Sequence, residues 1–429
     1  MRVLIVGSGG REHALAWRLA REAEVFAAPG NPGIAQCAEC FEVKADDTGG
    51  LVELCGRLRP DLAVVGPEAP LIAGLADRLR AAGHAVFGPG ADGARLEGSK
   101  AFAKEFMREA GVPTAAFATF REAAKAEEFA RQAYGEGGQL AVKASGPALG
   151  KGVAVAESLE EALAAIRRMM VDREFGDAGS EVVLEERLRG REFSLIALCS
   201  GESYASLPTA QDYKRAHDGD SGPNTGGMGS NSPVAWLSAE LVADAEDQVL
   251  APILKLLKAR AIDFRGALYA GLIVSEGETA KCLEFNVRFG DPETQCILPR
   301  VGPGFAEALV AAANGERLPS LRTLANAAVT VVVAAAEYPE TPRTGLPLTL
   351  ATPEEDGVLL FHAATRHGPN GLETSGGRAA NVTGVANGLA EARERAYRNV
   401  GLVRFEGARW RSDIACEPAP VPGSRIGRG

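Results

Sequence analysis

Short apolar runs alternate with amphipathic stretches along the first hundred residues. The apolar runs are residues 3–6, 25–28, 62–65 and 85–87, and the stretches between them include residues 12–21 and 71–82. Such alternation is typical of parallel βα units, whose ligands bind at the carboxyl ends of the strands. Three strand exits are rich in glycine and proline, and they read GSGG at 7–10, PGNPG at 29–33 and GPEAP at 66–70. We therefore predict a parallel sheet with these loops along one edge.

After residue 99 the chain continues as a mixture of helices and strands. A helix is predicted over 100–109 and another over 159–170, with strands at 140–143, 153–155 and 182–184. A chain of 429 residues has room for about three domains. The predicted divisions are 1–99, 100–119 as a connecting helix or hinge, 120–190 as a small αβ subdomain, 191–322, 323–420, and a flexible tail at 421–429.

Charge and cysteine usage narrow the function classes. The chain has 46 Lys and Arg against 56 Asp and Glu, a net charge of −10, without a basic tract. We therefore expect no nucleic-acid or membrane partner. Seven scattered cysteines are no disulfide framework, and we interpret the lone pair Cys37 and Cys40 as packing residues. Without a signal peptide or a long apolar run, a cytoplasmic location is expected.

The first glycine loop lies between a predicted strand and a predicted helix. Its backbone N–H groups and the helix dipole favour an anion such as phosphate. A dinucleotide fingerprint would need a glycine where Glu12 stands and an acidic residue where the second strand ends at Pro29. A phosphate-bearing metabolite is therefore favoured over NAD, with a purely structural turn as the alternative. Glu68, in the third loop, is a candidate for a sugar hydroxyl or an amine, or simply a solvated carboxylate.

A second glycine loop, SGPALGKG at 145–152, follows a strand ending in Lys143. It is not a Walker loop, because Lys151 is followed by Gly152 and not by Ser or Thr. A glycine loop between two antiparallel strands can cover a triphosphate while its lysines neutralise charge, although a solvated hairpin is the alternative. Acidic residues at 185, 186 and 192 are candidates for adenine and ribose contacts, but acidic surface clusters are common.

Glu284 and Asn286 alternate along a predicted strand over 282–287. Alternation puts their side chains on one face and Leu283 and Phe285 on the other. Two oxygen ligands suit Mg²⁺, which completes its octahedron with phosphate and water, although a structural pair is equally compatible with the pattern. Polar loops at 288–295, 211–215 and 222–229 are dense enough in functional groups to indicate a site, and the glycines of the last permit a movable flap.

Taken together, these motifs resemble the phosphoribosylamine-glycine ligase family of the ATP-grasp superfamily. The matching segments are GSGGREHALAW, APGNPG, VGPEAPL, LEGSKAFAKEFM, KASGPALGKGV, SGPNTGGMG, EFNVRFGDPETQ and SGGRAANVTG. The resemblance implies an α/β ATP-grasp fold with an amino-terminal parallel βα (pre-ATP-grasp) domain that binds the phosphoribosyl substrate, a mobile lid over 120–190, a core over 191–322 and a carboxy-terminal αβ domain. It also implies ligation of glycine to phosphoribosylamine through a glycyl phosphate made from ATP.

The family's functional residues carry over onto matching positions here. The implied catalytic residues are Asp212, Lys214, Arg215 and Arg288. The implied ATP-binding residues are Lys104, Lys143, Gly150, Lys151, Gly152, Glu185, Glu186 and Glu192. The implied substrate-binding residues are Gly9, Gly10, Asn31, Gly66, Pro67, Glu68, Asp291 and Pro292. Glu284 and Asn286 would hold Mg²⁺, with Mn²⁺ as an alternative. Only small-molecule partners and a monomer are expected, with a dimer as the alternative.

Two departures from the family pattern and three rival functions stay open. Pro147 and Leu149 stand where the family loop reads GLAAGKG, which would stiffen the hairpin, and Arg191 occupies a place that is often acidic. The rivals are another ATP-grasp ligase with a different acid or amine, a non-catalytic nucleotide sensor, and an NAD-dependent oxidoreductase. The sensor is disfavoured by the intact metal pair, and the oxidoreductase by Glu12.

Overall fold

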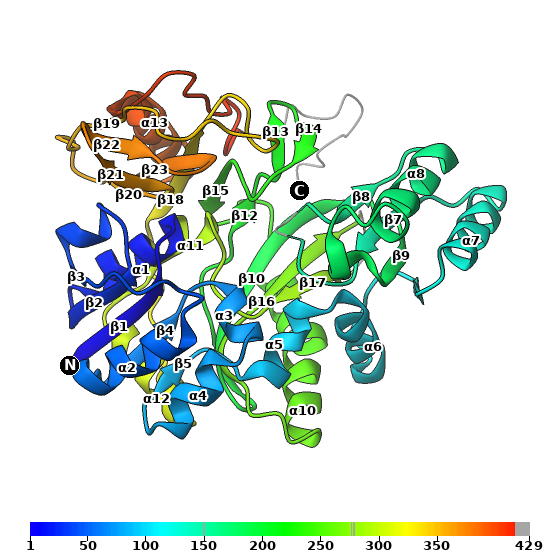
Figure 1. Cartoon of the computed structure of the whole chain (residues 1–429), viewed down its shortest axis with the longest axis horizontal. Coiled ribbons are helices and arrows are strands. Elements are labelled where there is room, and N and C mark those ends of the chain that lie inside the picture. Colours follow the sequence, from blue (N-terminus) through cyan, green and yellow to red (C-terminus); the bar gives the residue numbers. More distant parts are fainter. Residues whose placement is uncertain (149–150, 276, 278, 417–429) are drawn as a thin grey trace, which may run out of the picture.

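Four larger sheets organise the computed structural model, which describes residues 1–148, 151–275, 277 and 279–416 (Figure 1). Gly150 and the predicted flexible tail at 421–429 lie outside these residues. The amino-terminal sheet lies to the left in Figure 1, the carboxy-terminal sheet lies above it, and the small αβ subdomain projects to the right. None of the helices in the described part of the chain has the length and apolar character needed to cross a membrane.

The amino-terminal sheet is parallel, as predicted, with strand order β3-β2-β1-β4-β5. Its elements are β1 (Arg2–Gly7), α1 (Gly10–Leu19), β2 (Glu24–Pro29), β3 (Glu39–Cys40), α2 (Thr48–Leu58), β4 (Leu62–Val65), α3 (Glu68–Ile72), α4 (Leu75–Ala81), β5 (Val86–Phe87) and α5 (Ala91–Gly98). Residues 3–6 are fully buried because apolar clusters cover both faces of β1. The helix predicted over 71–82 is instead two helices, because Gly74 adopts φ +80° between them.

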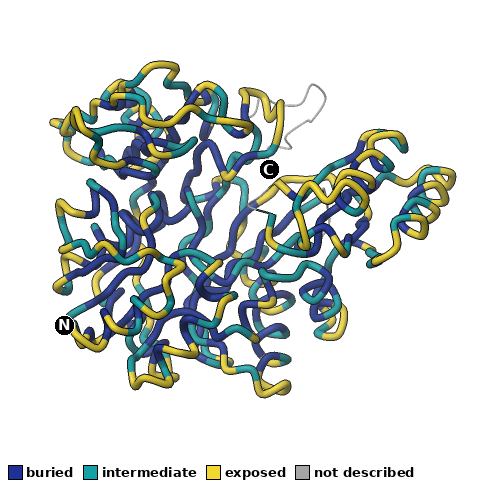
Figure 2. The backbone as a smooth tube through the Cα atoms, in the orientation of Figure 1, coloured by how far each residue is buried: buried dark blue, intermediate teal, exposed yellow. Residues whose placement is uncertain are grey.

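The small subdomain is an antiparallel sheet of order β6-β9-β7-β8 covered by two helices. Its elements are β6 (Phe117–Phe120), α7 (Ala123–Gly135), β7 (Leu140–Ala144), β8 (Val153–Val155), α8 (Leu159–Met170) and β9 (Val182–Glu186), preceded by α6 (Lys100–Ala110). One apolar cluster between residues 120 and 184 forms its core. The sheet therefore starts at Phe117, slightly before the division predicted at residue 120. Much of its helical surface is exposed in Figure 2.

The central sheet is antiparallel with order β11-β10-β16-β17. Its elements are β10 (Arg191–Ser200), β11 (Ser203–Ser206), α9 (Ala239–Ala245), α10 (Ala251–Ala259), β16 (Arg265–Val274), β17 (Lys281–Asn286), α11 (Glu293–Ile297) and α12 (Phe305–Asn314). Strands β10 and β16 pair along ten residues, from Arg191 opposite Val274 to Ser200 opposite Arg265. This long pairing places β17, which carries Glu284 and Asn286, beside the small subdomain.

The carboxy-terminal sheet has the order β12-β15-β18-β23-β20. Its elements are β12 (Gln211–Asp212), β15 (Gly229–Ser232), β18 (Ala327–Ala334), β20 (Val358–His362), β23 (Arg378–Ala386) and the covering helix α13 (Leu389–Asn399). The remaining strands pair as β13 (Arg215–His217) with β14 (Ser221–Asn224), β19 (Thr349–Leu350) with β24 (Val403–Arg404), and β21 (Thr365–Gly368) with β22 (Gly371–Thr374). Strands β12 and β15 thus join a sheet whose other strands lie more than ninety residues later in the chain.

A pair of buried histidines joins the amino-terminal and carboxy-terminal sheets. The backbone N–H of His362 donates to Nδ1 of His13 at 2.8 Å, and the two rings lie 5.6 Å apart. Asn31 strengthens this junction, because its Nδ2 donates to the backbone oxygens of Ser8 and His362 at 2.8 and 3.2 Å. Burial lowers the pKa of His13 to about 3 and of His362 to about 4, so both rings are neutral near pH 7.

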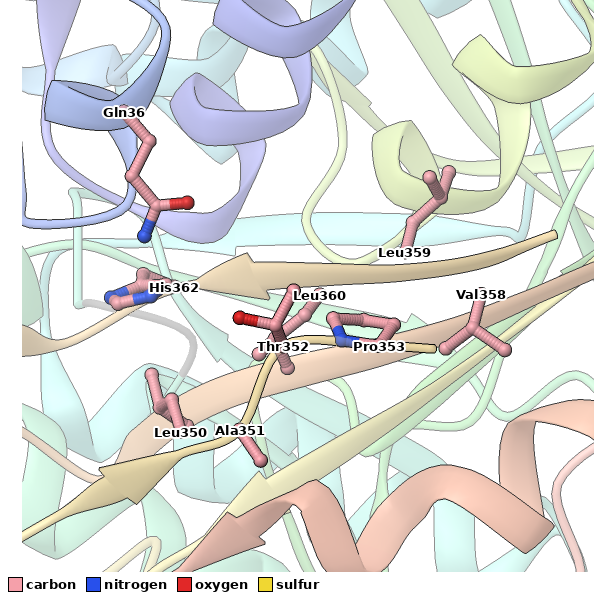
Figure 3. A pocket seen from close by; sticks show the side chains of 9 residues that line it. All are labelled: Gln36, Leu350, Ala351, Thr352, Pro353, Val358, Leu359, Leu360 and His362. Atoms are coloured by element: carbon pink, nitrogen blue, oxygen red, sulfur yellow. The ribbon is translucent and has the colours of Figure 1, made fainter. Parts of the chain in front are cut away.

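A small cavity of about 210 Å³ opens beside this junction (Figure 3). Gln36 faces it from the amino-terminal region, while His362 and the segment 350–353 face it from the carboxy-terminal region. None of the residues predicted for a functional site lines it.

Candidate active site

A much larger cavity, of about 1580 Å³, lies where the four regions meet. The predicted site residues that line it are Glu68, Lys104, Lys143, Gly152, Glu185, Glu186, Glu192, Asp212, Lys214, Arg215, Glu284, Asn286, Arg288 and Asp291. They come from loops and strand ends of all four sheets, although they are spread over more than two hundred residues of sequence. The fold therefore gathers most of the predicted site at one place.

Two lysines share one buried carboxylate at the end of the cavity next to the small subdomain. Lys104 on α6 and Lys143 on β7 place Nζ 2.9 and 3.0 Å from the two oxygens of Glu185 on β9. Lys104 Nζ also donates to Thr114 Oγ1 at 2.7 Å, and Lys143 Nζ to the backbone oxygen of Leu283 at 3.4 Å. Burial and the nearby Lys143 lower the pKa of Lys104. The two cations and one anion leave a net positive charge here, which suits a polyphosphate.

A third lysine, Lys214, also lines the cavity. Lys214 Nζ is 3.3 Å from Glu192 Oε2 and 3.8 Å from Glu284 Oε1. Although burial opposes a charged lysine, Glu192 and Glu284 hold the pKa of Lys214 well above its usual value. Burial likewise opposes a charged Glu284, but Lys214, Lys143 and other nearby cations lower its pKa to about 2. Both groups are therefore charged across the neutral range.

Arg288 connects the central sheet to the amino-terminal region. Its Nη2 lies 2.9 Å from Glu97 Oε1 and donates to Asn286 Oδ1 at 3.0 Å, while its Nε lies 3.6 Å from Glu68 Oε2. Glu97 also accepts a 2.8 Å hydrogen bond from the backbone N–H of Val287. Burial opposes the charge, but these carboxylates hold the pKa of Arg288 above its usual value. The guanidinium is thus fixed beside the predicted metal ligands.

Two acidic side chains, Glu293 and Asp212, form a pair that borders the cavity. Glu293 Oε1 accepts hydrogen bonds from Tyr269 OH and, at 3.1 Å, from Ser194 Oγ. Burial and the charge of Glu293 raise the pKa of Asp212 well above its usual value. Oδ1 of Asp212 is buried without a hydrogen-bond partner among the described residues. This oxygen lies close to Gly227, where an added Cβ would be 2.6 Å away.

The strand β17 departs from the predicted alternation. Glu284 pairs with Gly271 and Cys282 with Leu272, so Leu283 is the extra residue of a β-bulge. The predicted strict alternation is therefore wrong at Leu283, and both Leu283 and Phe285 border the cavity. Glu284 and Asn286 still line it together. A charged carboxylate and an amide oxygen fit the one or two protein ligands that Mg²⁺ takes beside phosphate and water. No group of three or more His, Cys, Asp or Glu among the described residues forms a denser metal centre.

The amino-terminal glycine loop is more enclosed than its sequence indicates. Glu12 Oε2 accepts a hydrogen bond of 2.6 Å from the N–H of Gly9, and a Cβ on Gly66 would lie 2.1 Å from Glu12 Oε1. A Cβ on Gly10 would lie 2.4 Å from Asn381 Nδ2. Asn31 is engaged in the junction of the sheets. The predicted substrate residues Glu68 and Asp291 line the cavity, whereas Gly9, Gly10, Asn31, Gly66, Pro67 and Pro292 are not among its lining residues.

Lys151 is the one described lysine of the predicted ATP set that lies apart from the others. Its exposed side chain donates to the backbone oxygen of Glu340 in the carboxy-terminal region at 3.5 Å, whereas Pro147, Ala148 and Gly152 of the same loop line the cavity. Contact between Lys151 and a nucleotide would need a movement of the loop.

Several functional candidates were not predicted, although their motifs were recognised. Glu97 and Lys100 lie in LEGSKAFAKEFM, Glu293 in EFNVRFGDPETQ and Arg378 in SGGRAANVTG. Arg378 Nη2 is 3.2 Å from Asp291 Oδ2, and its Nη1 donates to the backbone oxygens of Asp291 and Gly227 at 2.9 and 3.3 Å. Only their shared position on the cavity distinguishes these residues from ordinary charged residues.

The fold and the cavity define a protein of the ATP-grasp class, in which two αβ units enclose a charged cleft. Three family models match consecutive parts of the chain. The N domain of phosphoribosylglycinamide synthetase matches residues 1–97, its ATP-grasp (A) domain residues 98–294 and its C domain residues 328–417. The chain belongs to the phosphoribosylglycinamide synthetase family, as the sequence motifs predicted.

Similar proteins agree with this assignment. The chain is 46% identical to a phosphoribosylamine-glycine ligase of Streptomyces coelicolor over 98% of this chain and 100% of that protein, and 44% identical to one of Chlorobaculum tepidum over 97% and 100%. The crystal structure of the Thermotoga maritima phosphoribosylamine-glycine ligase matches with a TM-score of 0.84 at 34% identity, covering 96% of this chain and all of that one. A biotin carboxylase domain from Hydrogenobacter thermophilus shares the fold with a TM-score of 0.74 at 17% identity, covering 95% and 91%. The predicted fold class is confirmed.

Proposed function

We propose that the protein is an ATP-dependent ligase that joins glycine to 5-phosphoribosylamine. The products are glycinamide ribonucleotide, ADP and phosphate, a step of de novo purine biosynthesis. The observation that carries the proposal is the convergence of Lys104, Lys143, Lys214 and Arg288 on one cavity with the charged carboxylate of Glu284. Membership of the family and identity over nearly full length to proteins named for this reaction support it.

The first chemical step is attack of a glycine carboxylate oxygen on the γ-phosphorus of ATP, which releases ADP and forms glycyl phosphate. Lys104 and Lys143 hold the phosphate chain, and Glu185 keeps the two ammonium groups oriented toward it. Lys214 and Arg288 neutralise the charge that accumulates when a carboxylate meets a phosphate. Asp212, which lines the cavity together with Lys214, binds the ammonium group of glycine.

In the second step the amine of phosphoribosylamine attacks the glycyl carbonyl carbon, and phosphate leaves. Glu68 and Asp291, which line the cavity, bind this substrate together with the amino-terminal glycine loops. An acyl phosphate hydrolyses readily, so the subdomain at 120–190 closes over the site to exclude water. Glu186 and Glu192 border the adenosine end, and Gly152 and Lys151 approach the phosphates when the lid closes.

Glu284 and Asn286 are the residues that would hold a divalent cation, Mg²⁺ first and Mn²⁺ as the alternative. Their oxygens fit a hard cation that shares its other positions with phosphate and water. Such an ion supplies charge neutralisation and orientation of the phosphates. Arg288, which donates to Asn286 Oδ1, fixes the orientation of this amide.

The proposal is tested by measuring ADP formation with ATP, Mg²⁺, glycine and enzymatically generated phosphoribosylamine. We expect release of ADP only when both substrates are present, and a product with the mass of glycinamide ribonucleotide. Replacing glycine by alanine or aspartate in the same assay distinguishes a glycine ligase from another ATP-grasp ligase that uses a different acid. ADP formation that is indifferent to glycine would contradict the proposal, and nucleotide binding without any turnover would favour a sensor.

The oligomeric state, the location and the functional units of the enzyme belong to the same proposal. It works as a monomer, because one chain supplies every residue named here, and light scattering that shows a stable dimer would contradict this. Its location is the cytoplasm, since all seven cysteines, each within the described residues, are free thiols. The divisions predicted at 1–99, 100–119, 120–190, 191–322 and 323–420 are the proposed functional units, with strands β12 and β15 linking the last two.

A further inference from the structure

The last described segment of the chain, residues 409–416, lies along the hairpin formed by β13 and β14. Each hydrogen bond between them uses at least one side chain. Gly219 N–H donates to Asp413 Oδ2 and Ser412 N–H to Asp218 Oδ1, each at 2.8 Å, at the turn of the hairpin. Nearer its base, Ala415 N–H donates to Tyr213 OH at 3.0 Å. The segment therefore binds the hairpin along its whole length.

Arg411 is the centre of this contact. Its side chain is 1% exposed, and its Nη1 donates to the backbone oxygen of Arg215 at 3.1 Å and to Asp220 Oδ1 at 2.8 Å. Its Nη2 donates to Asp413 Oδ2 at 2.6 Å, and its guanidinium carbon lies 5.2 Å from the centroid of the Tyr213 ring. One cation thus touches the residue before Lys214 and the residue after it.

The other side of the segment is held by the carboxy-terminal domain. Tyr397 OH donates to the backbone oxygen of Arg411 at 2.7 Å and accepts from Ile414 N–H at 3.0 Å. Arg393 donates to the backbone oxygens of Ser412 and Ile414 at 2.7 and 2.9 Å. Ile414 is fully buried in the apolar cluster of this domain. The hairpin is therefore attached, through the segment, to a rigid body.

The Lys214 side chain is held less firmly than the backbone around it. Its two ion pairs are 3.3 and 3.8 Å long, whereas the segment makes two shorter bonds beside it, to the backbone oxygen of Arg215 at 3.1 Å and to Tyr213 OH at 3.0 Å. The position of Nζ in the cavity then depends mainly on the backbone of the hairpin. A displacement of about 1 Å at a charge that neutralises a transferring phosphate is enough to slow a reaction about a hundredfold.

We propose that Arg411 is a positioning residue for the ligation reaction, and that residues 409–416 form a strap by which the carboxy-terminal domain sets Lys214 in the active site. The inference rests on the proposed function. It gives the carboxy-terminal domain a role in the phosphoryl-transfer chemistry, besides closing the cavity. The strap acts on the hairpin and not on the ATP lysines, which belong to α6 and β7.

The test compares Arg411→Met with Arg395→Met in the full chain. Arg395 is a matched control, because it also pairs with two carboxylates, Glu355 and Glu391, and a backbone oxygen of the same domain, but it does not line the cavity. We expect Arg411→Met to lower kcat at least tenfold, while the affinity for a non-hydrolysable ATP analogue with Mg²⁺, measured by calorimetry, stays within twofold. Arg395→Met should keep kcat within twofold. An equal loss in both variants, or an unchanged kcat in Arg411→Met, would overturn the proposal.

Two further measurements keep the test decisive if Arg411→Met folds poorly. Asp220→Asn removes one exposed partner of Arg411 and should lower kcat two- to fivefold at an unchanged melting temperature; a wild-type kcat would contradict the strap. Trypsin should cleave after Lys214 and Arg215 faster in Arg411→Met and Asp220→Asn than in Arg395→Met, and equal rates would contradict it. The cleavage assay needs no substrate, so its result stands even if the wild-type protein shows no glycine-dependent turnover, an outcome that would remove only the proposed function.

Discussion

The two sides of the large cavity are held in place by different interactions. On the side of the amino-terminal, central and carboxy-terminal sheets, ion pairs cross from one sheet to another, as between Arg288 and Glu68 or between Arg378 and Asp291. On the lid side, the apolar core is contained within residues 120–184. The links from the lid to the rest include the pairing of Lys104 with Glu185 and the hydrogen bond from Lys143 to Leu283.

This difference indicates that the two sides of the cavity have different functions. A subdomain with its own core can move as a body, because its packing is unaffected when a few polar links break. Opening the other side would separate the ion pairs Arg288–Glu68 and Arg378–Asp291 together with the histidine junction. We infer that the lid side governs access and affinity of the nucleotide. The side formed by the amino-terminal, central and carboxy-terminal sheets, called the fixed side below, governs the position of the metal, glycine and the phosphoribosyl substrate.

The largest effect is expected on the fixed side. Glu284→Gln removes the charge that pairs with Lys214 and that would hold the cation, so kcat should fall at least about a hundredfold, about 3 kcal/mol. The measurement is ADP release at saturating ATP and glycine. Glu202→Gln, which changes an exposed carboxylate paired with Lys258, is the charge-matched control and should behave as wild type. A Glu284→Gln enzyme with normal turnover would remove the metal assignment.

The second effect tests the lid side. Lys143→Met should lower kcat/KM for ATP about thirty- to hundredfold, because Lys143 lies buried beside Glu185 and faces the cavity. Lys151→Met should lower it about threefold to tenfold, since this exposed lysine reaches the nucleotide only when the loop moves. Steady-state kinetics in ATP provides both values. Equal losses would mean that the loop is already in its working position without the lid closing.

A third prediction concerns the rigidity of the fixed side. Burial lowers the pKa of His13 to about 3 in the folded chain. Between about pH 6.5 and 3, His13 therefore binds a proton in the unfolded chain but not in the folded chain. Stability should therefore fall with pH from about 6.5 toward 3, and this one group accounts for about 2 kcal/mol at pH 5. His13→Asn keeps an acceptor for the His362 N–H but does not titrate, so its stability should fall by about 2 kcal/mol less between pH 7.5 and 5.

Urea unfolding followed by tryptophan fluorescence measures this difference, because Trp17 packs 5.8 Å from Phe361 at the same junction. His362 titrates in both proteins and cancels from the comparison. Parallel pH profiles for the two proteins would show that His13 does not contribute to the junction in the way its burial indicates.

The smallest effect is expected for Pro147, which departs from the family pattern in the glycine loop at 145–152. Pro147 lines the cavity and restricts the backbone of the lid hairpin. Pro147→Ala should change KM for ATP by about threefold or less and leave kcat unchanged, because Pro147 supplies no charge to the phosphates. A large change in kcat would place hairpin stiffness in the chemical step and so weaken the proposed division between the two sides. The other departure, Leu149, lies outside the described residues.

The sequence by itself determined the local structure and the types of residue at the site. Hydrophobic alternation predicted the parallel strands around residues 3–6, and the motifs identified the family and the residues Lys143, Glu284 and Arg288. These features depend on short segments, whose periodicity and turn residues reflect local geometry directly.

Only the tertiary structure decided which of these segments meet. It introduced a bulge at Leu283, placed Glu185 between two lysines, and engaged Asn31 at the junction of two sheets. It also brought Arg411 to the backbone oxygen of Arg215 and the ring of Tyr213, the two neighbours of Lys214, about two hundred residues earlier in the chain. The physical reason is that burial and ion pairing between distant segments depend on how whole sheets pack, and a local pattern carries no information about the partner across the interface.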